Sequence, residues 1–348
     1  MNGCSHFGVE SEVLTLSPTS VERTVEVDGH LVHRCRSNFE FASTPFSVSA
    51  FWRFRQYLKQ ADIVHYHYPY PFTDILHLLS GVNIPSVVTY HSDIVKQKYL
   101  LKAYRPLKRR FLSSVDHIVA TSPNYVRTST VLDRYSDKVS AIPIGLDKES
   151  YPVPSDALTS LWRERFGSKF FLFVGMLRYY KGLHILIEAA KGATYPIVIV
   201  GAGPIEEELK QLVIKNEVTN IHFVGRVSDE DKVALLELSC GVVFPSHLRS
   251  EAFGVSLLEG AMYGKALISS EIGTGTTYIN IDGETGLVVP PSDPAALRTA
   301  MDRLWNDTEL ASSMGNKAYQ RYLELFTADR MSSSYVKLYQ SLLDRNGR

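Results

Sequence analysis

The segment Glu251-Ala-Phe-Gly-Val-Ser-Leu-Leu-Glu259 decides how the second half of this 348-residue chain is interpreted. It follows an apolar run, Gly241–Phe244, that is typical of a buried strand. Glu251 is therefore expected in a strand-to-helix loop, and Glu259 about two turns further along. The amides of residues 252–254 would then point outward at the positive end of the helix, which suits a diphosphate. The alternative for the two carboxylates alone is a loop Glu and a solvated helical Glu.

The same order of strand, loop and helix recurs along the whole chain. Near-continuous apolar strands between helices favour a parallel sheet covered on both faces, and therefore an α/β fold. In the first half, the expected strands are Val9–Leu16, Val25–Val27, Leu31–Arg34, Ile63–Tyr66, Ser86–Thr89, His117–Ala120 and Lys138–Ile142. In the second half, they are Phe170–Val174, Pro196–Val200, Ile221–Val224, Gly241–Phe244, Ala266–Ser269 and Gly286–Val289.

Because this alternation occurs twice, the sequence predicts two Rossmann-like domains that face each other across a cleft. The first domain is expected to span residues 1–147, a linker 148–167, and the second domain 168–328. Residues 329–348 are expected to form a helix that packs back on the first domain. Doubly wound sheets bind ligands at the carboxyl ends of their strands, so the predicted site lies in that cleft.

A second group of reactive residues follows the strand Phe170–Val174. That strand ends at Gly175, and the next loop carries Arg178 and Lys181. Two cations at the carboxyl end of a strand suit a departing diphosphate, which gains negative charge as its bond breaks. The alternative is a solvated start of a helix, although cations there oppose the helix dipole.

Composition excludes several classes of protein. Lys and Arg together number 37, as do Asp and Glu, so a globally basic nucleic-acid binder is not expected. The three cysteines (Cys4, Cys35 and Cys240) stand far apart, which argues against a disulfide-stapled secreted domain. Neither a membrane-spanning run nor a signal peptide is evident. The sequence therefore predicts a cytoplasmic protein.

These motifs together resemble the donor domain of retaining glycosyltransferases with the GT-B fold, and most of all bacterial enzymes that add mannose or rhamnose to cell-surface polysaccharides. The resemblance covers most of residues 168–292. Besides the two motifs above, the matching segments are Val200–Pro204, Phe223–Val227, Gly273–Thr277 and Asp282–Gly286. A looser likeness extends into the first half through Ile63–His67 and Thr89–Asp93.

The resemblance implies a nucleotide-diphosphate sugar as donor, GDP-linked by preference, and no metal or other cofactor. Arg178 and Lys181 would hold the diphosphate, and Glu259 the ribose hydroxyls. Glu251 would position the donor sugar. The remaining donor-binding residues would be Gly175, Arg226, Val227, Phe253, Gly254, Gly275 and Thr276. Many relatives place the Arg directly after the strand glycine, where this chain has Met176, so the role of Arg178 is less well supported than that of Lys181.

On the acceptor side, the resemblance implies that His91 faces the reacting carbon of the donor. The new bond would keep the anomeric configuration of the donor through front-face attack, with the leaving phosphate helping to take the acceptor's proton. His65 and His67 alternate on one expected strand and so share one face. They could contact the acceptor or simply pack at the end of the strand. The acceptor would be a growing, lipid-linked surface saccharide.

Two weaker signals have structural explanations. Asp229-Glu230-Asp231 fits an Asp-x-Asp metal pattern, but it follows Ser228 directly before an apolar helical run, where acids stabilise the helix dipole. No catalytic metal is therefore expected. Gly201-Ala-Gly-Pro resembles the start of a dinucleotide fingerprint, but Glu206 replaces the third glycine. A tight turn between strand and helix is the better interpretation.

A basic segment, Lys96–Arg110, carries seven cations, no acid and interleaved apolar residues. It is predicted to be an amphipathic helix that is either a solvated face or a peripheral contact with anionic lipid at the inner face of the cell membrane. Nucleic acid is a poorer partner because the total charge is zero.

Members of this family open with an apolar strand, a glycine-rich loop and a helix. Here the segment from Phe7 to Leu16 is typical of the second strand, so about 30 residues of the first unit are expected to be missing. Two other functions remain open. One is a non-catalytic chain that binds nucleotide without turnover, and the other is a sugar-nucleotide epimerase of the same fold.

Overall fold

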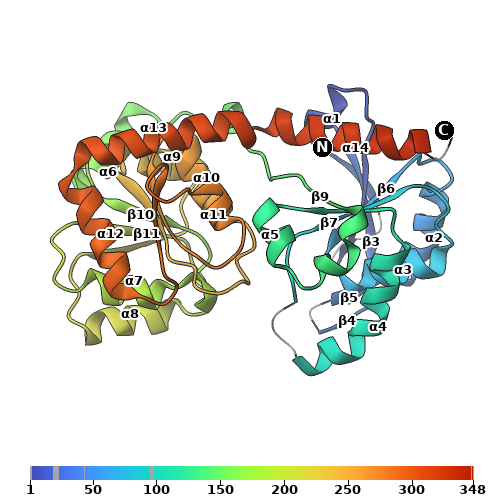
Figure 1. Cartoon of the computed structure of the whole chain (residues 1–348), viewed down its shortest axis with the longest axis horizontal. Helices are drawn as coiled ribbons and strands as arrows, with labels where there is room; N and C mark the ends of the chain where they lie inside the picture. The colour runs from blue at the N-terminus through green and yellow to red at the C-terminus, as the bar shows by residue number, and fades with distance from the viewer. Residues whose placement is uncertain (1, 19–22, 43, 95–97, 346, 348) are drawn as a thin grey trace. The chain divides into compact units, whose positions relative to one another are not determined.

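The computed structural model describes residues 2–18, 23–42, 44–94, 98–345 and 347. The chain forms two compact units, both drawn in Figure 1. Unit 1 comprises Met1–Thr121, Ser129–Pro143 and Ala328–Arg348. Unit 2 comprises Ser122–Thr128 and Ile144–Thr327.

Unit 2 contains a six-stranded sheet in which every pairing is parallel. Its strands are β10 (Phe171–Val174), β11 (Ile197–Val200), β12 (Ile221–Gly225), β13 (Gly241–Phe244), β14 (Ala266–Ser270) and β15 (Gly286–Val289). Their order is β12-β11-β10-β13-β14-β15. The chain therefore starts in the middle of the sheet, builds one half and then reverses, which is the doubly wound arrangement. The strands expected in the second half are confirmed.

Helices cover both faces of this sheet (Figure 1). Apolar side chains of α7, α8 and α12 form the core on one face, and those of α6, α9 and α10 form the core on the other. Helix α13 contributes to both cores. The helices of unit 2 are α5 (Pro123–Thr128), η2 (Lys148–Ser150), α6 (Asp156–Phe166), η3 (Tyr179–Lys181), α7 (Leu183–Ala190), α8 (Glu206–Lys215), α9 (Asp229–Leu238), α10 (Val255–Met262), α11 (Thr276–Ile279), α12 (Pro294–Asn306) and α13 (Thr308–Leu325).

Unit 1 holds a four-stranded parallel sheet of order β6-β7-β8-β9. Its strands are β6 (Val64–Tyr68), β7 (Ser86–Tyr90), β8 (His117–Ala120) and β9 (Val139–Ala141). Helix α14 packs on this sheet and places Leu342 against Val87 and Val119. The helices of unit 1 are α1 (Asn2–Ser5), α2 (Val48–Tyr57), α3 (Pro71–Ser80), α4 (Lys98–Ser114), η1 (Leu132–Lys138) and α14 (Ala328–Arg345).

The first part of unit 1 departs from the expected parallel sheet. Strands β1 (Glu12–Ser17), β2 (Arg23–Val27) and β3 (His30–Arg36) form a separate sheet of order β1-β3-β2, and β2 runs antiparallel to β3. Asp28 and Gly29 both have positive φ, 48° and 76°, so they make the tight hairpin turn that Asp-Gly favours. A second hairpin, β4 (Phe39–Phe41) with β5 (Thr44–Phe46), was not expected at all.

Unit 2 also includes a segment that the predicted domain boundary assigned to the first domain. Thr128, at the end of α5, donates from its hydroxyl to Gly273 O at 2.5 Å. Asn124 Nδ2 donates to Thr277 Oγ1 at 3.2 Å. These contacts attach residues 122–128 to the loop after β14, and a boundary drawn along the sequence cannot show such an exchange.

Candidate active site

The candidate site of unit 2 lies where the order of its sheet reverses. Strands β10 and β13 are neighbours, although two other strands separate them along the chain. The loops that leave their carboxyl ends carry Lys181 and Glu251. Because adjacent parallel strands end at the same edge, these loops meet there, and ligands bind at this position in doubly wound sheets.

The structure brings Lys181 and Glu251 into direct contact. Lys181 Nζ lies 2.5 Å from Glu251 Oε2, and the two residues are only 9% and 8% exposed. Ser246 donates a further hydrogen bond to the same carboxylate oxygen at 3.1 Å. A buried ion pair costs desolvation energy, which the extra hydrogen bond offsets in part. The pair therefore keeps a charged lysine buried in unit 2. A group with more negative charge than one carboxylate could attract that lysine.

Close packing of the backbone explains why Lys181 lies against β13. Gly182 follows it with φ of 72°, in the left-handed region. A Cβ at this position would lie 2.0 Å from Pro245 O, so no other residue fits without moving the loop. The glycine lets the loop after β10 touch the loop after β13, and it thereby sets the position of the lysine.

Arg178 lies apart from this pair. Its side chain is exposed, and its Nε donates to Met176 Sδ at 2.9 Å. The assignment of both cations to the diphosphate stays a prediction. Residue Met176, which stands where many relatives have the arginine, is the one that holds Arg178 here.

Glu259 is buried on α10, with 6% exposure. Its Oε1 accepts a hydrogen bond from Tyr151 OH at 2.9 Å and pairs with Lys232 Nζ at 3.0 Å. Burial and the neighbouring Glu259 raise the pKa of Tyr151, so this phenol keeps its proton and remains a donor. Both contacts fall on one oxygen, and Oε2 takes part in neither.

The start of α10 has the geometry expected for an anion site. Gly254 is its N-cap, with φ of 99°, and no side chain caps the first amides. Phe253 before it is buried. The loop after β14 packs directly on this turn, because a Cβ on Gly275 would lie 2.6 Å from Phe253 Cδ2. Thr276, the next residue, is also buried.

The other predicted donor-binding residues lie on neighbouring loops. Gly175 N donates to Val200 O at 3.0 Å, and Gly201 N donates to Gly225 O at 2.8 Å. These bonds join the loops that end β10, β11 and β12. Arg226 follows with an exposed side chain, whereas Val227 packs against the core.

Two residues of the loop after β13 were not predicted. Arg249 Nη1 donates to Gly273 O at 2.9 Å, and its guanidinium lies 5.3 Å from the centre of the Tyr125 ring. His247 packs its ring at 5.0 Å from both Tyr179 and His184. Their position between β13 and Glu251 could have indicated them, because functional side chains lie at the carboxyl ends of strands in such sheets.

Unit 1 places the three predicted histidines in one stack. His67 Nδ1 lies 2.9 Å from His91 Nε2, and their rings stack at 5.2 Å. His65 stacks on the other side of His67 at 5.1 Å. It lies within hydrogen-bond distance of Thr89 Oγ1 at 2.7 Å and of Tyr339 OH at 2.6 Å.

The histidine stack favours neutral rings. Burial, together with His67 and His91, lowers the pKa of His65 to about 3. Burial and His67 lower the pKa of His91 to about 4. Burial likewise lowers the pKa of His67. Two adjacent imidazolium ions would repel each other, so the stack is uncharged near neutral pH.

The Asp229-Glu230-Asp231 segment caps a helix, as expected. Ser228 Oγ accepts from Asp231 N at 3.1 Å, and Asp231 Oδ2 accepts in return from Ser228 N at 3.2 Å. This is a capping box at the start of α9. Within the ranges that the structure describes, no group of three or more His, Cys, Asp or Glu side chains is arranged to hold a metal ion.

The predicted basic helix is only partly exposed. Lys96 lies outside the described residues. Lys108 is buried at 8% exposure, so it is not part of a solvated face. Among the residues of α4 whose burial is described, 102–114, the exposed cations are Lys102, Arg105, Arg109 and Arg110. In the described part of the chain, no helix is long and apolar enough to cross a bilayer.

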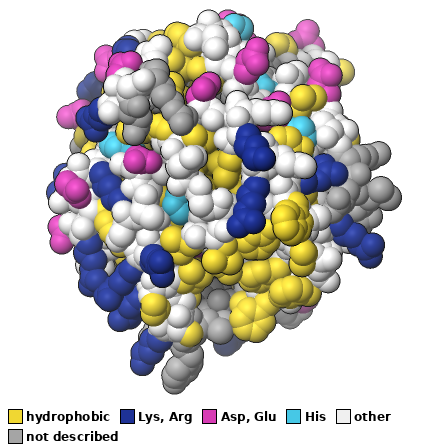
Figure 2. All heavy atoms as spheres, turned by 90° about the vertical axis from the view of Figure 1, so that its right-hand side faces the viewer, with side chains coloured by type: hydrophobic (Ala, Val, Ile, Leu, Met, Phe, Trp, Pro, Cys, Tyr) yellow, Lys and Arg dark blue, Asp and Glu magenta, His cyan; other side chains and the backbone are white. Residues whose placement is uncertain are grey.

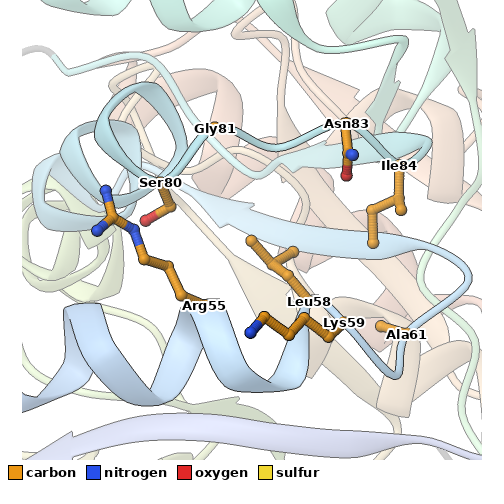
Figure 3. A pocket seen from close by; sticks show the side chains of 8 residues that line it. All are labelled: Arg55, Leu58, Lys59, Ala61, Ser80, Gly81, Asn83 and Ile84. Carbon is orange, nitrogen blue, oxygen red and sulfur yellow. The ribbon is translucent and has the colours of Figure 1, made fainter.

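A cavity of about 460 Å³ lies elsewhere in unit 1 (Figure 3). Arg55 and Lys59, at the end of α2, line one side of it, and Ser80 and Asn83 line the other. The carboxyl ends of two helices meet there, and Arg55 Nη2 already donates to Leu79 O at 2.6 Å. The negative ends of the helix dipoles oppose an anion at this place, so the cavity adds nothing to the candidate site.

Comparisons with known proteins identify the family of the chain. Residues 162–321 match the family described as Glycosyl transferases group 1, and residues 2–150 match Glycosyltransferase Family 4. The chain is 59% identical to the D-rhamnosyltransferase WbpZ of Pseudomonas aeruginosa, over 92% of this chain and 84% of that protein. It is 50% identical to the O-antigen chain mannosyltransferase C of Escherichia coli, over 98% of this chain and 92% of that protein.

Two solved structures show the fold. Sucrose-phosphate synthase from Thermosynechococcus elongatus matches with a TM-score of 0.79 at 20% identity, over 99% of this chain and 91% of that one. HepE of Anabaena in complex with UDP and glucose matches with a TM-score of 0.75 at 17% identity, over 90% of this chain and 87% of that one. The predicted α/β fold of the GT-B type is confirmed.

Proposed function

The chain belongs to the glycosyl transferases group 1 family, and from that premise we propose that it moves mannose, or a deoxyhexose such as rhamnose, from a nucleotide-diphosphate sugar to a growing surface polysaccharide. It is a retaining hexosyltransferase, so the transferred sugar keeps its anomeric configuration. The names of the two curated relatives, a D-rhamnosyltransferase and an O-antigen chain mannosyltransferase, support this class of donor and acceptor.

The observation that carries the proposal is the buried Lys181–Glu251 pair beside the uncapped start of α10. A diphosphate has more negative charge than one carboxylate, so it would draw the Lys181 ammonium away from Glu251. The carboxylate would then be free to accept hydrogen bonds from the donor sugar. Donor binding would thus replace one ion pair by another and avoid leaving a lysine buried and unpaired.

Lys181 contributes most when the sugar leaves. The bond from the anomeric carbon to the phosphate oxygen breaks, and the charge that develops on that oxygen meets the ammonium and the amides of α10. In the proposed front-face attack, the departing phosphate oxygen takes the proton from the acceptor hydroxyl. The proposal assigns His91 a contact near the reacting carbon, where a neutral imidazole can accept or donate a hydrogen bond.

Glu259 is assigned to the ribose. Tyr151 and Lys232 both hold Oε1, which fixes the carboxylate and directs Oε2 as an acceptor for a hydroxyl. Arg226 and Val227 are assigned to the base, and guanine is the proposed base by resemblance to the family. The acceptor is proposed to be a lipid-linked saccharide, and the exposed cations of α4 are proposed to contact the anionic membrane that carries it.

Substitutions in the candidate site test the proposal. Lys181→Ala is expected to lower kcat about 10²–10³-fold, since it removes charge stabilisation from the leaving group. Glu259→Ala is expected to weaken GDP binding about tenfold and to change kcat much less, since it removes ground-state contacts. Transfer from GDP-mannose and GDP-rhamnose to a lipid-linked acceptor, with calorimetry of GDP and UDP, measures both effects.

Lys210→Ala on α8 is the matched control. Lys210 also pairs with a glutamate, Glu206, at 2.7 Å, but on an exposed surface of unit 2. Its replacement should leave transfer and binding at parental values. The proposal fails if Lys181→Ala and Glu259→Ala both transfer sugar at the parental rate. A parental chain that binds GDP but transfers to no acceptor supports the non-catalytic alternative.

A further inference from the structure

Two neighbouring strands of unit 1 place histidines on one face of their sheet. His65 and His67 alternate on β6, and His91 follows β7 directly. The chain has 11 histidines, and the described ones that reach the face drawn in Figure 2 lie apart from one another. The stack that these three histidines form therefore has a local cause.

The outer ring of the stack, His65, is held at both of its nitrogens. Its Nδ1 lies 2.6 Å from Tyr339 OH, and its Nε2 lies 2.7 Å from Thr89 Oγ1. In the neutral ring, one hydroxyl donates to the bare nitrogen and the other accepts from the N–H. A flip of the ring would turn two carbons toward these hydroxyls and break both hydrogen bonds. The plane of the His65 ring is therefore fixed.

Helix α14 contributes a second hydroxyl to this network. Tyr335 OH lies 2.8 Å from Thr89 Oγ1, and Thr89 is only 3% exposed. Tyr335 and Tyr339 are four residues apart and so lie on one face of the helix. Burial raises the pKa of Tyr335 to about 12 and raises the pKa of Tyr339 as well. Both phenols therefore keep their protons at neutral pH.

The orientation of His65 is passed to the other two rings of the stack. His67 stacks on His65 at 5.1 Å with 9° between the ring planes. His91 stacks on His67 at 5.2 Å with 11° between the planes, and His67 Nδ1 lies 2.9 Å from His91 Nε2. Rings in close contact restrict the rotation of one another. The direction of the His91 nitrogens therefore depends on groups that His91 does not touch.

We propose that Thr89 and the two tyrosines of α14 are positioning residues for His91, and that they act through the fixed ring of His65. The inference rests on the proposed function, which assigns His91 a contact near the reacting carbon. A small displacement of a group at that place lowers the rate by a large factor. Helix α14 would thus serve the transfer reaction as well as the packing of unit 1.

Removal of single hydroxyls tests this inference in the full chain. Tyr339→Phe removes the hydroxyl that holds His65 Nδ1. It is expected to lower kcat about tenfold, while KM for the donor stays within about twofold of the parent, because a displaced His91 acts on the transition state. Thr89→Val loses the hydroxyl between His65 and Tyr335 and should behave likewise. Thr89→Ser keeps that hydroxyl and should keep the parental rate.

Nitrogen NMR of the His91 ring is a readout that a general loss of stability would not imitate. In the parent, one nitrogen of this ring should carry the proton and the other should be bare. In Tyr339→Phe, the chemical shifts of the two nitrogens should move toward each other, because the loosened ring exchanges between its two tautomers. The signals are assigned by their loss in His91→Gln. The spectrum needs neither donor nor acceptor.

Tyr66→Phe is the matched control. Tyr66 points to the opposite face of β6, and its hydroxyl lies 3.0 Å from His77 Nδ1, so it forms a tyrosine–histidine pair outside the stack. Its kcat and its His91 spectrum should be parental. Parental kcat and spectrum in Tyr339→Phe would overturn the inference, as would a lower rate with an unchanged His91 spectrum, or an equal loss in Tyr66→Phe. A parent that transfers no sugar would count against the proposed function and leave the NMR result valid.

Discussion

Single hydrogen bonds decide the chemical state of the histidine stack. His67 Nδ1 and His91 Nε2 lie 2.9 Å apart, so one of the two nitrogens carries a proton and the other accepts it. A proton added to both rings would break this bond and place two charges side by side. Burial and this partner keep the pKa of His91 at about 4, and the ring is neutral at pH 7.

Replacement of His67 is expected to change the pH dependence of transfer. In the parent, kcat/KM should stay constant from neutral pH down to about pH 5 and fall as His91 is protonated. His67→Ala opens the site to water and removes the partner ring, so the pKa of His91 should rise toward its ordinary value of about 6.5. The acid limb of kcat/KM should then move upward by one unit or more.

Steady-state kinetics between pH 4.5 and 8, with circular dichroism to check folding at each pH, measure this change. His117→Ala on β8 is the control, since His117 lies 2.8 Å from Ser140 Oγ, outside the stack. An acid limb that is the same in His67→Ala and in the parent would show that His67 does not set the state of His91.

At the scale of elements, a buried carboxyl couples α3 to α4. Asp74 is 0% exposed and accepts a hydrogen bond from Tyr104 OH. Burial raises the pKa of Asp74 to about 7, although Tyr104 and Lys108 act in the opposite direction. In the unfolded chain, the same carboxyl should titrate near pH 4.

This difference predicts that unit 1 loses stability as pH rises from about 4 to about 7. Below that window Asp74 is protonated in both states, and within it only the unfolded state loses the proton. A difference of about three pKa units corresponds to at most about 4 kcal/mol in the free energy of unfolding. Asp74→Asn keeps an acceptor for Tyr104 but cannot ionise, so its stability should vary less with pH in this window.

Hydrogen exchange of the unit 1 amides at increasing urea concentration reports on unit 1, because tryptophan fluorescence would mix Trp52 with Trp162 and Trp305 of unit 2. Asp62→Asn, at an exposed acid of the same unit, is the control. If the stability of Asp74→Asn follows the same pH profile as the parent between pH 4 and 7, burial of this carboxyl does not control the α3–α4 contact.

At the scale of the whole molecule, the end of the chain returns to the unit in which the chain began. Helix α14 follows α13 of unit 2 but packs on β7 and β8 of unit 1. Leu342 and Val336 are 3% and 5% exposed. Tyr339 and Tyr335 lie within hydrogen-bond distance of His65 and Thr89, at 2.6 and 2.8 Å. The sheet of unit 1 therefore depends on residues contributed from the far end of the sequence.

Truncation after Thr327, which removes α14, is expected to destabilise unit 1 and to leave unit 2 stable. Loss of α14 uncovers the apolar face of β7 and β8, so amides of unit 1 should exchange much faster. Unit 2 keeps both of its cores, and GDP affinity should stay within about threefold of the parent, since distant sites act independently. Hydrogen exchange and calorimetry measure the two effects.

A control that lacks only residues 346–348 should match the parent in both measurements. Slow exchange of the unit 1 amides in the chain without α14 would contradict the prediction.

Much of unit 2 could be predicted because its signals are local. Apolar runs such as Ile197–Val200 indicate buried parallel strands. Glu251 precedes the start of a helix, and Glu259 lies within that helix. The β4–β5 hairpin escaped prediction because Phe39 and Phe41 are exposed aromatics, which sequence patterns assign to the core. The burial of Lys108 was not predicted either, because a run of cations does not indicate which of its side chains is buried.

Sequence alone determined the succession of strands and helices along unit 2, the places of Lys181 and Glu251 in loops that follow strands, and the place of Glu259 in a helix, because these follow from neighbours along the chain. Only the tertiary structure decided that Lys181 meets Glu251 and that His67 meets His91. Those pairings join segments that strand order and close packing bring together, and the partner of a side chain depends on that packing rather than on distance in sequence.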